Sequence, residues 1–302
     1  MKSGCFFVLW LGLCTLEPAR AGEPARYDLD LNRPPPKAGD LTERTVQVFS
    51  SNHNTNLAAG RMDITNSFHS FTVQVREKIL SWDFSNDTSK VEMTMERFGD
   101  NLDGRTNELA QSGTRLTGTS IAGETFFHTE SGALSVQGYE QLQQFYCIRP
   151  RDFNEFTHAP IPRQIAAGAT WEIPAPANLA AMAGFFGASF TNAIKATGQF
   201  VGLTNLFGLD CFHLRFQAAA AELPEYLRRQ VTHGMPVAIK SRVNLTMDLI
   251  VPFDASRNPL QTIFAMDFYL TGDVTAGDKK TLTTQGQTSL KIISECRPLA
   301  HP

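Results

Sequence analysis

The stretch Arg242–Asp273 reads RVNLTMDLIVPFDASRNPLQTIFAMDFYLTGD, and it decides the fold class. Apolar and polar residues alternate along both halves, and a period of two places the apolar side chains of a strand on one face. If the halves pair across Pro252–Pro259, their apolar faces coincide. The expected partners are Val243 with Phe268, Leu245 with Met266, Met247 with Phe264, Leu249 with Thr262 and Val251 with Leu260. The stretch predicts a long antiparallel hairpin that needs further strands or a helix on its apolar face.

Similar patterns predict the remaining elements. Strands are expected at Thr45–Ser50, His69–Phe84, Lys90–Phe98, Gly198–Leu206, Leu209–Phe216 and Thr288–Ser294. Gly99–Arg105 predicts a turn, and Arg115–Leu134 predicts short strands broken at its glycines. Helices are expected at Tyr139–Cys147, Leu179–Lys195 and Leu223–Gly234. Strands dominate without regular strand–helix alternation, so we predict a mainly β fold: an antiparallel, curved open sheet or half-barrel with one or two helices on one face.

The start of the chain has the features of a secretory signal peptide. Lys2 gives a positive start, Cys5–Leu16 is a short apolar run, and Ala19-Arg20-Ala21 fits the small-x-small cleavage pattern. We therefore predict that Met1–Ala21 is a signal peptide and that 22–302 forms a single β-rich domain. Residues 22–40, which include three consecutive prolines, are expected to form an extended N-terminal arm.

The signal predicts an exported protein in the periplasm or outside the cell. A lipoprotein signal ending at Cys14 is the alternative, although Leu13 stands where a small residue is wanted. The Cys5–Leu16 run is too short to span a bilayer, and no later segment has the pattern of a membrane span.

Composition and cysteine spacing exclude several classes of site. The chain of 302 residues has a net charge of −3 and no basic run, so we expect no nucleic-acid partner. After signal removal Cys147, Cys211 and Cys296 remain, which allows one disulfide whose pairing the sequence leaves open. Their wide spacing excludes a zinc ribbon and a C-x-x-C redox site. We expect no metal and no cofactor.

No enzyme motif is complete in this sequence. The nearest match is Gly118-Thr-Ser120-Ile-Ala122, which lacks the last glycine of G-x-S-x-G and is followed by turn and strand residues rather than a helix. The histidines are scattered and none pairs at metal-ligand spacing. His213 lies beside Asp210 and Cys211, but in a strand these neighbours point to opposite faces. We therefore predict no catalytic residues.

The uncharged segment Leu179–Ile194 is the candidate binding element. It supplies Leu179, Met182, Phe185, Phe186 and Phe190 as candidate ligand-binding residues. One interpretation is core packing against the concave face of the sheet. The other is an adaptable wall or lid over an apolar cavity, for which Met, Gly and Phe are suited. Together with 22 phenylalanines, the second interpretation predicts a non-enzymatic binder of a lipid-like ligand in the cell envelope.

Two other functions remain open. A structural or protein-interaction module of the envelope predicts an exposed apolar patch or edge strand in place of a cavity. A hydrolase with Ser120 as nucleophile predicts an imidazole within hydrogen-bond reach of the Ser120 hydroxyl.

The segment Gln164–Ile173, QIAAGATWEI, resembles the v-x-v-G-D-x-W segment of exported bacterial proteins that share a domain of unknown function. Ala169 replaces the aspartate of that pattern. The order of the predicted hairpins is also similar, so the resemblance implies a β-rich exported fold over most of the chain after the signal peptide. It implies no activity and no site residues.

Overall fold

The structure, a computed structural model, describes residues 25–29, 36–58, 61–83, 88–121, 124–129, 134–146, 162, 164–173, 195–220, 237–254, 257–276 and 279–299. These residues form one 12-stranded antiparallel sheet, a two-stranded sheet and a single helix. The fold is mainly β, as predicted. The elements are β1 (Arg26–Tyr27), β2 (Leu41–Ala58), β3 (Arg61–Asp83), β4 (Thr88–Leu102), β5 (Arg105–Ala110), β6 (Arg115–Ile121), β7 (Glu124–Thr129), α1 (Val136–Phe145), β8 (Ile165–Ala166), β9 (Thr170–Ile173), β10 (Lys195–Leu206), β11 (Leu209–Ala220), β12 (Val237–Pro252), β13 (Gln261–Ala276) and β14 (Lys279–Pro298).

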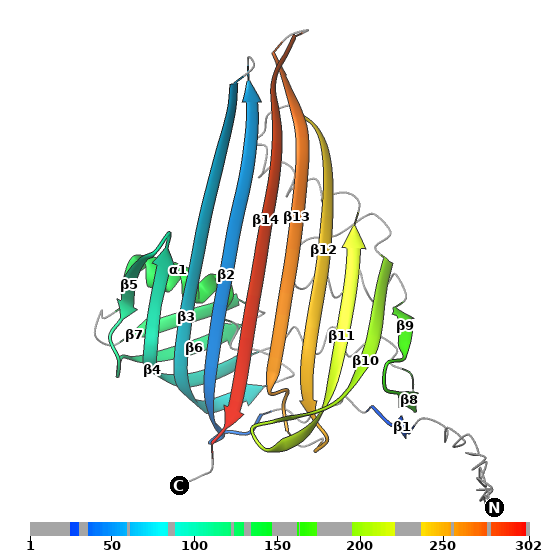
Figure 1. The fold of residues 1–302 in the computed structure, drawn as a ribbon. Helices are drawn as coiled ribbons and strands as arrows, with labels where there is room; N and C mark the ends of the chain where they lie inside the picture. The colour runs from blue at the N-terminus through cyan, green and yellow to red at the C-terminus, as the bar shows by residue number, and fades with distance from the viewer. Residues whose placement is uncertain are drawn as a thin grey trace, which may run out of the picture.

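The large sheet is open and runs in the order β7-β6-β4-β3-β2-β14-β13-β12-β11-β10-β9, with β5 also paired to β4. The last strand, β14, returns to lie between β2 and β13. Five long strands, β3, β2, β14, β13 and β12, rise above their shorter neighbours (Figure 1). We call the end of the sheet where β2 and β13 end, at Ala58 and Ala276, the upper end of the sheet.

The predicted hairpin is confirmed by β12 and β13. Val243 pairs with Phe268, Leu245 with Met266, Met247 with Phe264 and Leu249 with Thr262, whereas the predicted pair of Val251 with Leu260 is not formed because the β12–β13 pairing ends at Ile250 and Gln261. Both strands continue beyond the predicted ends, because backbone pairing carries on where the apolar alternation stops.

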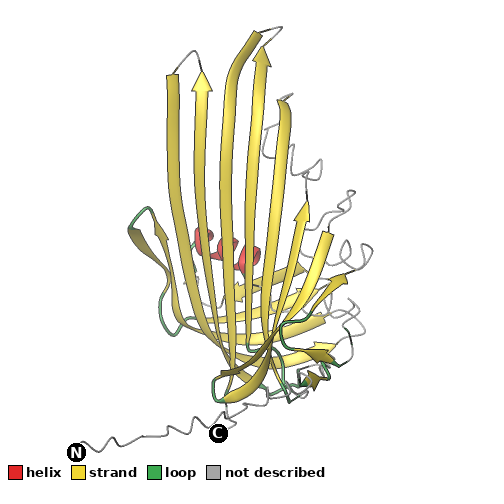
Figure 2. Cartoon of the chain, turned by 45° about the vertical axis from the view of Figure 1, so that its right-hand side comes forward, coloured by secondary structure: helices red, strands yellow, loops and turns green. Residues whose placement is uncertain are grey.

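The two faces of the sheet differ in what packs against them. We call the face that carries α1 the inner face and the opposite one the outer face (Figure 2). At one end of the inner face, Leu142 of α1 and Tyr146 directly after the helix lie in a core with Val46, Val73 and other side chains of β2–β7. Ser135 caps the start of the helix, and its hydroxyl accepts a hydrogen bond from the Gly138 amide. It confirms the helix predicted at Tyr139–Cys147, although it begins earlier.

At the other end of the inner face lies the small β1–β8 sheet. Tyr27 packs edge-on against Phe200, with ring centroids 5.5 Å apart. Ile165 is buried in the same cluster. The turn after β8 needs Gly168, whose φ of 81° favours glycine. Farther along β9, the Trp171 indole covers Gly198 so closely that a Cβ at position 198 would meet it at 2.2 Å.

Three local predictions need correction. Gly99–Arg105 is not one turn, because β4 continues to Leu102 and only Asp103-Gly104 turns. Asp103 has a positive φ of 48° there, which aspartate tolerates. Gly118 does not break a strand but lies inside β6, opposite Val91 and Phe127. Lys195 begins β10 rather than ending a helix. The predicted helices over 179–194 and Leu223–Gly234 lie outside the described residues.

Candidate ligand-binding face

The middle of the inner face carries a cluster of apolar side chains from β11–β14, which we call the central cluster. Val243, Leu245 and Phe264 are buried in it, and Ala218, Met266, Phe268, Leu290 and Ile292 are partly buried. Within the described chain, every member comes from the sheet itself. The clusters on either side include α1 or the β1–β8 sheet, so the central cluster differs from them in its packing partners.

Above the central cluster the inner face becomes polar. Following the pairing from β13 through β14 and β2 to β3, the row of Met266 contains Leu290, Ser50 and His69. The next rows toward the upper end contain Thr288, Asn52, Ser67, Gly286, Asn54 and Thr65. Asn52 donates a hydrogen bond to the Ser67 hydroxyl at 3.4 Å. The same strands therefore offer an apolar surface followed by amide and hydroxyl groups.

The outer face, by contrast, becomes apolar at the upper end of β2 and β3. Leu57, Met62, Ile64 and Phe68 share this face and are 48%, 62%, 53% and 45% exposed. Lower on β3, the apolar residues Phe71, Val73 and Val75 are on the inner face and fully buried. β2 and β3 pair without a register shift from Leu41 opposite Lys78 to Ala58 opposite Arg61. The apolar side of β3 thus switches between Phe68 and Phe71.

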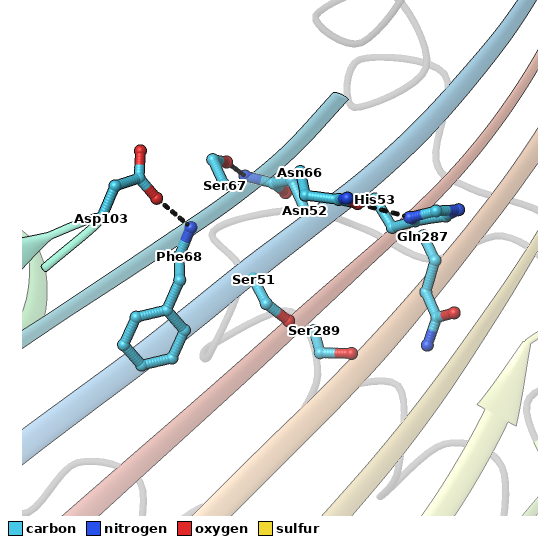
Figure 3. Close-up of a pocket in the computed structure, with 9 residues that line it drawn as sticks. All are labelled: Ser51, Asn52, His53, Asn66, Ser67, Phe68, Asp103, Gln287 and Ser289. Atoms are coloured by element: carbon cyan, nitrogen blue, oxygen red, sulfur yellow. Dashed lines mark hydrogen bonds between the residues drawn. The ribbon is translucent and has the colours of Figure 1, made fainter. Parts of the chain in front are cut away.

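An open depression of about 410 Å³ lies on the upper part of β2, β3 and β14 (Figure 3). Its lining consists of Ser51, Asn52, His53, Asn66, Ser67, Phe68, Asp103, Gln287 and Ser289. The His53 Nδ1 and Asn66 Oδ1 atoms are 2.5 Å apart, and the Ser289 hydroxyl donates to Asp267 at 2.6 Å. This lining is polar except for Phe68, so the depression is suited to water or a polar group and not to an enclosed apolar ligand.

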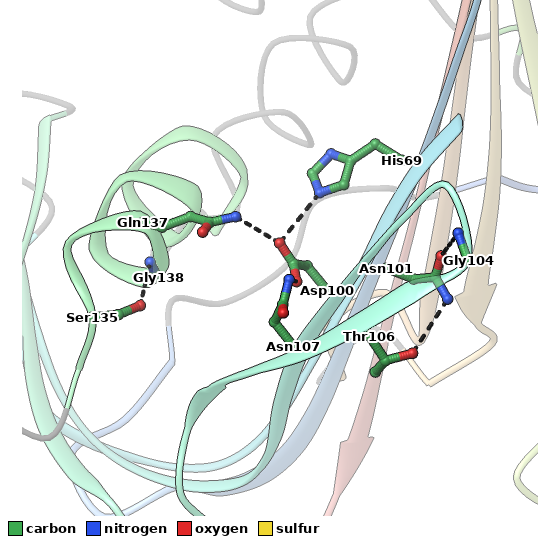
Figure 4. Close-up of polar contacts among 9 residues, drawn as sticks. All are labelled: His69, Asp100, Asn101, Gly104, Thr106, Asn107, Ser135, Gln137 and Gly138. Atoms are coloured by element: carbon green, nitrogen blue, oxygen red, sulfur yellow. Dashed lines mark hydrogen bonds and ion pairs between the residues drawn. The ribbon is translucent and has the colours of Figure 1, made fainter. Parts of the chain in front are cut away.

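A buried carboxylate holds α1 beside the polar part of the inner face (Figure 4). Asp100 accepts hydrogen bonds from Gln137 at 2.6 Å and from Asn107 at 3.0 Å. The His69 Nε2 atom lies 3.7 Å from the same carboxylate. The side chain of Asp100 is only 1% exposed, whereas that of His69 is 30% exposed. Each donor reduces the cost of burying the charge, so this cluster fixes α1 and β5 on β4.

A second buried carboxylate lies beneath the other end of α1. The Tyr146 hydroxyl donates to Glu77 at 2.5 Å, and the Arg44 guanidinium lies over the Tyr146 ring at 4.6 Å from its centroid. Burial and the nearby Glu77 raise the pKa of Tyr146 well above its ordinary value. Burial likewise raises the pKa of the neighbouring Cys296 thiol to about 11, so it stays protonated near neutral pH. The cluster is suited to anchoring rather than nucleophilic chemistry.

The outer face holds a third polar cluster, which sequence reasoning missed. His213 Nε2 and Arg215 Nε each lie 2.8 Å from the same Asp248 oxygen. Arg215 and Asp248 are direct partners across β11 and β12. The sequence places His213 beside Asp210 along the chain, but its charged partner comes from the next strand. The pairing register of β11 with β12, which places Arg215 opposite Asp248, was the signal that could have revealed this cluster.

The predicted site residues have different outcomes. Leu179, Met182, Phe185, Phe186 and Phe190 lie outside the described residues, so their role in ligand binding stays a prediction. Ser120 is 1% exposed within β6, and among the described histidines none forms a hydrogen bond with it. A nucleophile needs such a base, and the described histidines supply none to Ser120, so the hydrolase hypothesis gains no support from the described residues.

Several other predictions can be compared with the described part of the chain. Cys211 and Cys296 are both free thiols, so they do not form the disulfide, and Cys147 lies outside the described residues. No group of three or more His, Cys, Asp or Glu side chains that could hold a metal ion occurs among the residues described. The helix in the described part of the chain is not long and apolar enough to cross a membrane.

Comparison with known proteins assigns no family. No family model and no curated protein matches the sequence. A structure of lipid–protein interactions in lipovitellin is similar at a TM-score of 0.34 and 8% identity, over 88% of this chain and 26% of that chain. This chain therefore spans about a quarter of that protein's length.

Two other solved structures are similar over most of both chains. A DUF1329 family protein from Desulfovibrio piger has a TM-score of 0.11 and 8% identity, over 81% of this chain and 84% of that chain. The TodX monoaromatic hydrocarbon channel has a TM-score of 0.21 and 10% identity, over 88% and 91%. At these TM-scores the likenesses support no inference about function. The resemblance of Gln164–Ile173 to a domain of unknown function stays a prediction.

Proposed function

We propose that the protein binds a lipid-like amphiphile against the inner face of its sheet, without converting it chemically. The observation that carries the proposal is the central cluster, an apolar surface whose described members all belong to the sheet. Burial of apolar area is the main source of affinity for such a ligand. The polar rows above the cluster, with Asn52, Asn54 and Thr288, supply donors and acceptors for a headgroup.

The predicted signal peptide, Met1–Ala21, supports a place of action outside the cytoplasm. We propose the cell envelope, where a lipid-like ligand is available and an exported binder could carry it. The predicted residues of Leu179–Ile194 would then be further contributors to the apolar wall.

A matched pair of variants tests this proposal. Phe268 belongs to the central cluster, whereas Tyr269 beside it points to the outer face and is 39% exposed. The uncharged fluorescent probe N-phenylnaphthylamine is titrated into the wild type, Phe268→Gln and Tyr269→Gln. Burying one aromatic side chain is worth about 2 kcal/mol, so we expect Phe268→Gln to weaken binding more than tenfold. Tyr269→Gln should bind as the wild type does.

Circular dichroism and urea midpoints show whether both variants are folded. An inner face filled by the protein's own side chains would give no fluorescence increase with the wild type, and this result would refute the proposal. Equal binding by both variants would place the probe elsewhere and would refute it too. Native mass spectrometry of protein purified from its own envelope identifies the natural ligand as an added mass that disappears on organic extraction.

A second candidate function is favoured by the upper end of β2 and β3. Leu57, Met62 and Ile64 expose large apolar surfaces on the outer face, which a surface in contact only with water does not require. This is the exposed patch that an interaction module of the envelope predicts. Both functions can coexist, because the two surfaces lie on opposite faces of the sheet.

A further inference from the structure

The upper part of β3 is an edge of the sheet. Residues Arg61–Phe68 pair with β2 on one side, and β4 begins to pair with β3 only at His69. No described strand pairs with the other side of Arg61–Phe68, which lies at the margin of the sheet in Figure 1. Every residue of this segment is exposed. We call Arg61–Ser67 the upper edge.

Hydrogen bonds at Phe68 show which backbone groups of the upper edge point outward. The Phe68 amide donates to the Asp103 carboxylate at 2.8 Å, and the Asp103 amide donates to the Phe68 carbonyl at 2.9 Å. Phe68 therefore directs both backbone groups away from β2. Because this direction alternates along a strand, Met62, Ile64 and Asn66 also present their N–H and C=O groups outward.

Among the described residues, the upper edge has few of the features that protect an edge strand. It contains no proline and no lysine, its charged residues are Arg61 and Asp63, and its pairing with β2 has no bulge. The edge of β7 differs, since Gln143 of α1 donates to the Thr125 carbonyl there at 3.4 Å. Two residues with outward backbone groups, Met62 and Ile64, also have highly exposed apolar side chains. Another β-strand satisfies the backbone groups and covers part of these side chains together.

We propose that the upper edge pairs in antiparallel fashion with the upper edge of a second copy of this chain, with Ile64 on the two-fold axis. The register follows from three alternatives. An axis at Asp63 would place two carboxylates directly opposite each other, which is destabilising. An axis at Thr65 would place Phe68 opposite Met62, but the backbone groups of Phe68 are already bonded to Asp103. An axis at Ile64 uses only outward groups that are available.

Charge complementarity favours a second copy over an unrelated strand. In the Ile64 register, Arg61 of one copy lies opposite Ser67 of the other, next to its Asp103. The Arg61 side chain is 85% exposed, with its Nε 3.9 Å from the exposed Asp63 carboxylate of its own chain, and Asp103 is also exposed. Opposite charges therefore meet at both ends of the paired segment, because the two-fold axis repeats every contact. Ile64 meets its own counterpart in the centre, in an apolar cross-strand pair.

The oligomeric state of the full chain after signal removal tests the proposal. Sedimentation velocity without added ligand, over a wide range of concentrations, should show a monomer–dimer equilibrium for the wild type. Ile64→Lys places two like charges at the axis and should raise the dimer dissociation constant at least tenfold. Asn66→Pro removes an outward N–H without touching the β2 ladder and should have the same effect.

Leu57→Lys is the matched control. Leu57 lies on the same exposed apolar surface, but β2 is paired on both sides, so the upper edge stays intact. This variant should dimerise as the wild type does. Ile64→Cys should form an intermolecular disulfide, because directly paired residues have Cα atoms about 5.5 Å apart, within disulfide range. Leu57→Cys should not.

Three results would overturn the proposal. The wild type could be monomeric at every concentration. The dimer could persist in both Ile64→Lys and Asn66→Pro. It could also be lost equally in Leu57→Lys, which would indicate packing of apolar faces, and binding of that face to phosphatidylcholine vesicles would then identify a membrane as the partner. None of these results concerns the inner face, so the proposed ligand binding is tested separately by its own variants.

Discussion

Phe68 and Phe71 lie three residues apart on β3 and have opposite surroundings. Phe71 is 2% exposed on the inner face, where its ring lies 5.2 Å from that of Phe145. Phe68 is 45% exposed on the outer face, at the rim of the depression in Figure 3. Both residues pair regularly with β2. The comparison shows that a strand can exchange its apolar side without a bulge, provided that its neighbours continue the hydrogen-bond ladder.

The exchange separates two tasks along one strand. Below Phe71 the apolar side faces the core and stabilises the fold. Above Phe68 the apolar side faces outward, where the described part of the chain supplies no packing partner. We expect substitutions below the switch to affect stability, whereas those above it should affect association only.

The largest effect should come from Phe71→Ala. Removal of a buried phenylalanine leaves a cavity beneath α1, and we expect a loss of about 4 kcal/mol in the free energy of unfolding. Urea denaturation followed by circular dichroism measures it. A loss below about 1 kcal/mol would show that the lower inner face is not the stabilising core.

Tyr146→Phe should have the next largest effect. It removes the hydroxyl that donates to buried Glu77 and leaves that carboxylate with one donor fewer. A hydrogen bond to a charged group contributes about 2 kcal/mol, so the urea midpoint should fall accordingly. Tyr139→Phe, which removes an exposed hydroxyl from the same helix and keeps this bond, serves as the control. An unchanged midpoint in Tyr146→Phe would mean that water replaces the donor.

Alkaline pH should destabilise the protein through Cys296. The folded state raises the pKa of this thiol to about 11, above an unfolded value of roughly 8.5. The folded state therefore binds the proton more tightly, and its stabilising contribution is complete below the unfolded pKa and lost as pH rises toward 11. Urea midpoints between neutral pH and this value should fall less steeply for Cys296→Ala than for the wild type. Parallel curves would show that other groups cause the loss.

A smaller effect is expected for Asp248→Asn on the outer face. The carboxylate pairs with His213 and Arg215, but these side chains are partly exposed, so the pairs are worth at most about 1 kcal/mol. Thermal unfolding at low and high salt measures the contribution, which salt should reduce. Thr246→Ala, on the same face of β12, is the control. If Asp248→Asn lowered the free energy of unfolding as much as Tyr146→Phe does, the outer-face cluster would stabilise the fold as strongly as the buried one, contrary to expectation.

The smallest effect should come from Phe68→Ala. The side chain is nearly half exposed, so the free energy of unfolding should change by no more than about 0.5 kcal/mol. The same urea experiment as for Phe71→Ala provides the comparison. If Phe68→Ala and Phe71→Ala lost similar stability, the Phe68 side chain would have to be packed as tightly as Phe71, in conflict with its 45% exposure.

Much of the sheet could be predicted from the sequence, because local alternation is sufficient to identify a strand and its register across a short loop. The β12–β13 pairing is the clearest case. The polar ends of β2, β3 and β14 could not be predicted in this way. Asn52, Asn54 and Gly286 lack any apolar alternation, and only backbone pairing with neighbours keeps them extended. The predicted ligand-binding residues lie outside the described residues, so their role stays a prediction. The sequence indicated only the part of the central cluster that belongs to the β12–β13 hairpin, because the members from β11 and β14 join it through pairing between strands.

The sequence by itself determined the mainly β class, the antiparallel hairpins and the apolar side of each half-buried strand, since these depend on residues close together in the chain. The tertiary structure alone decided that β14 lies beside β2, which carboxylates are buried beneath α1, and where β3 becomes an edge. Those features join residues as distant as Glu77 and Tyr146, or they depend on where a neighbouring strand ends. Pairing between distant segments is set by the packing of the whole sheet, which no local pattern encodes.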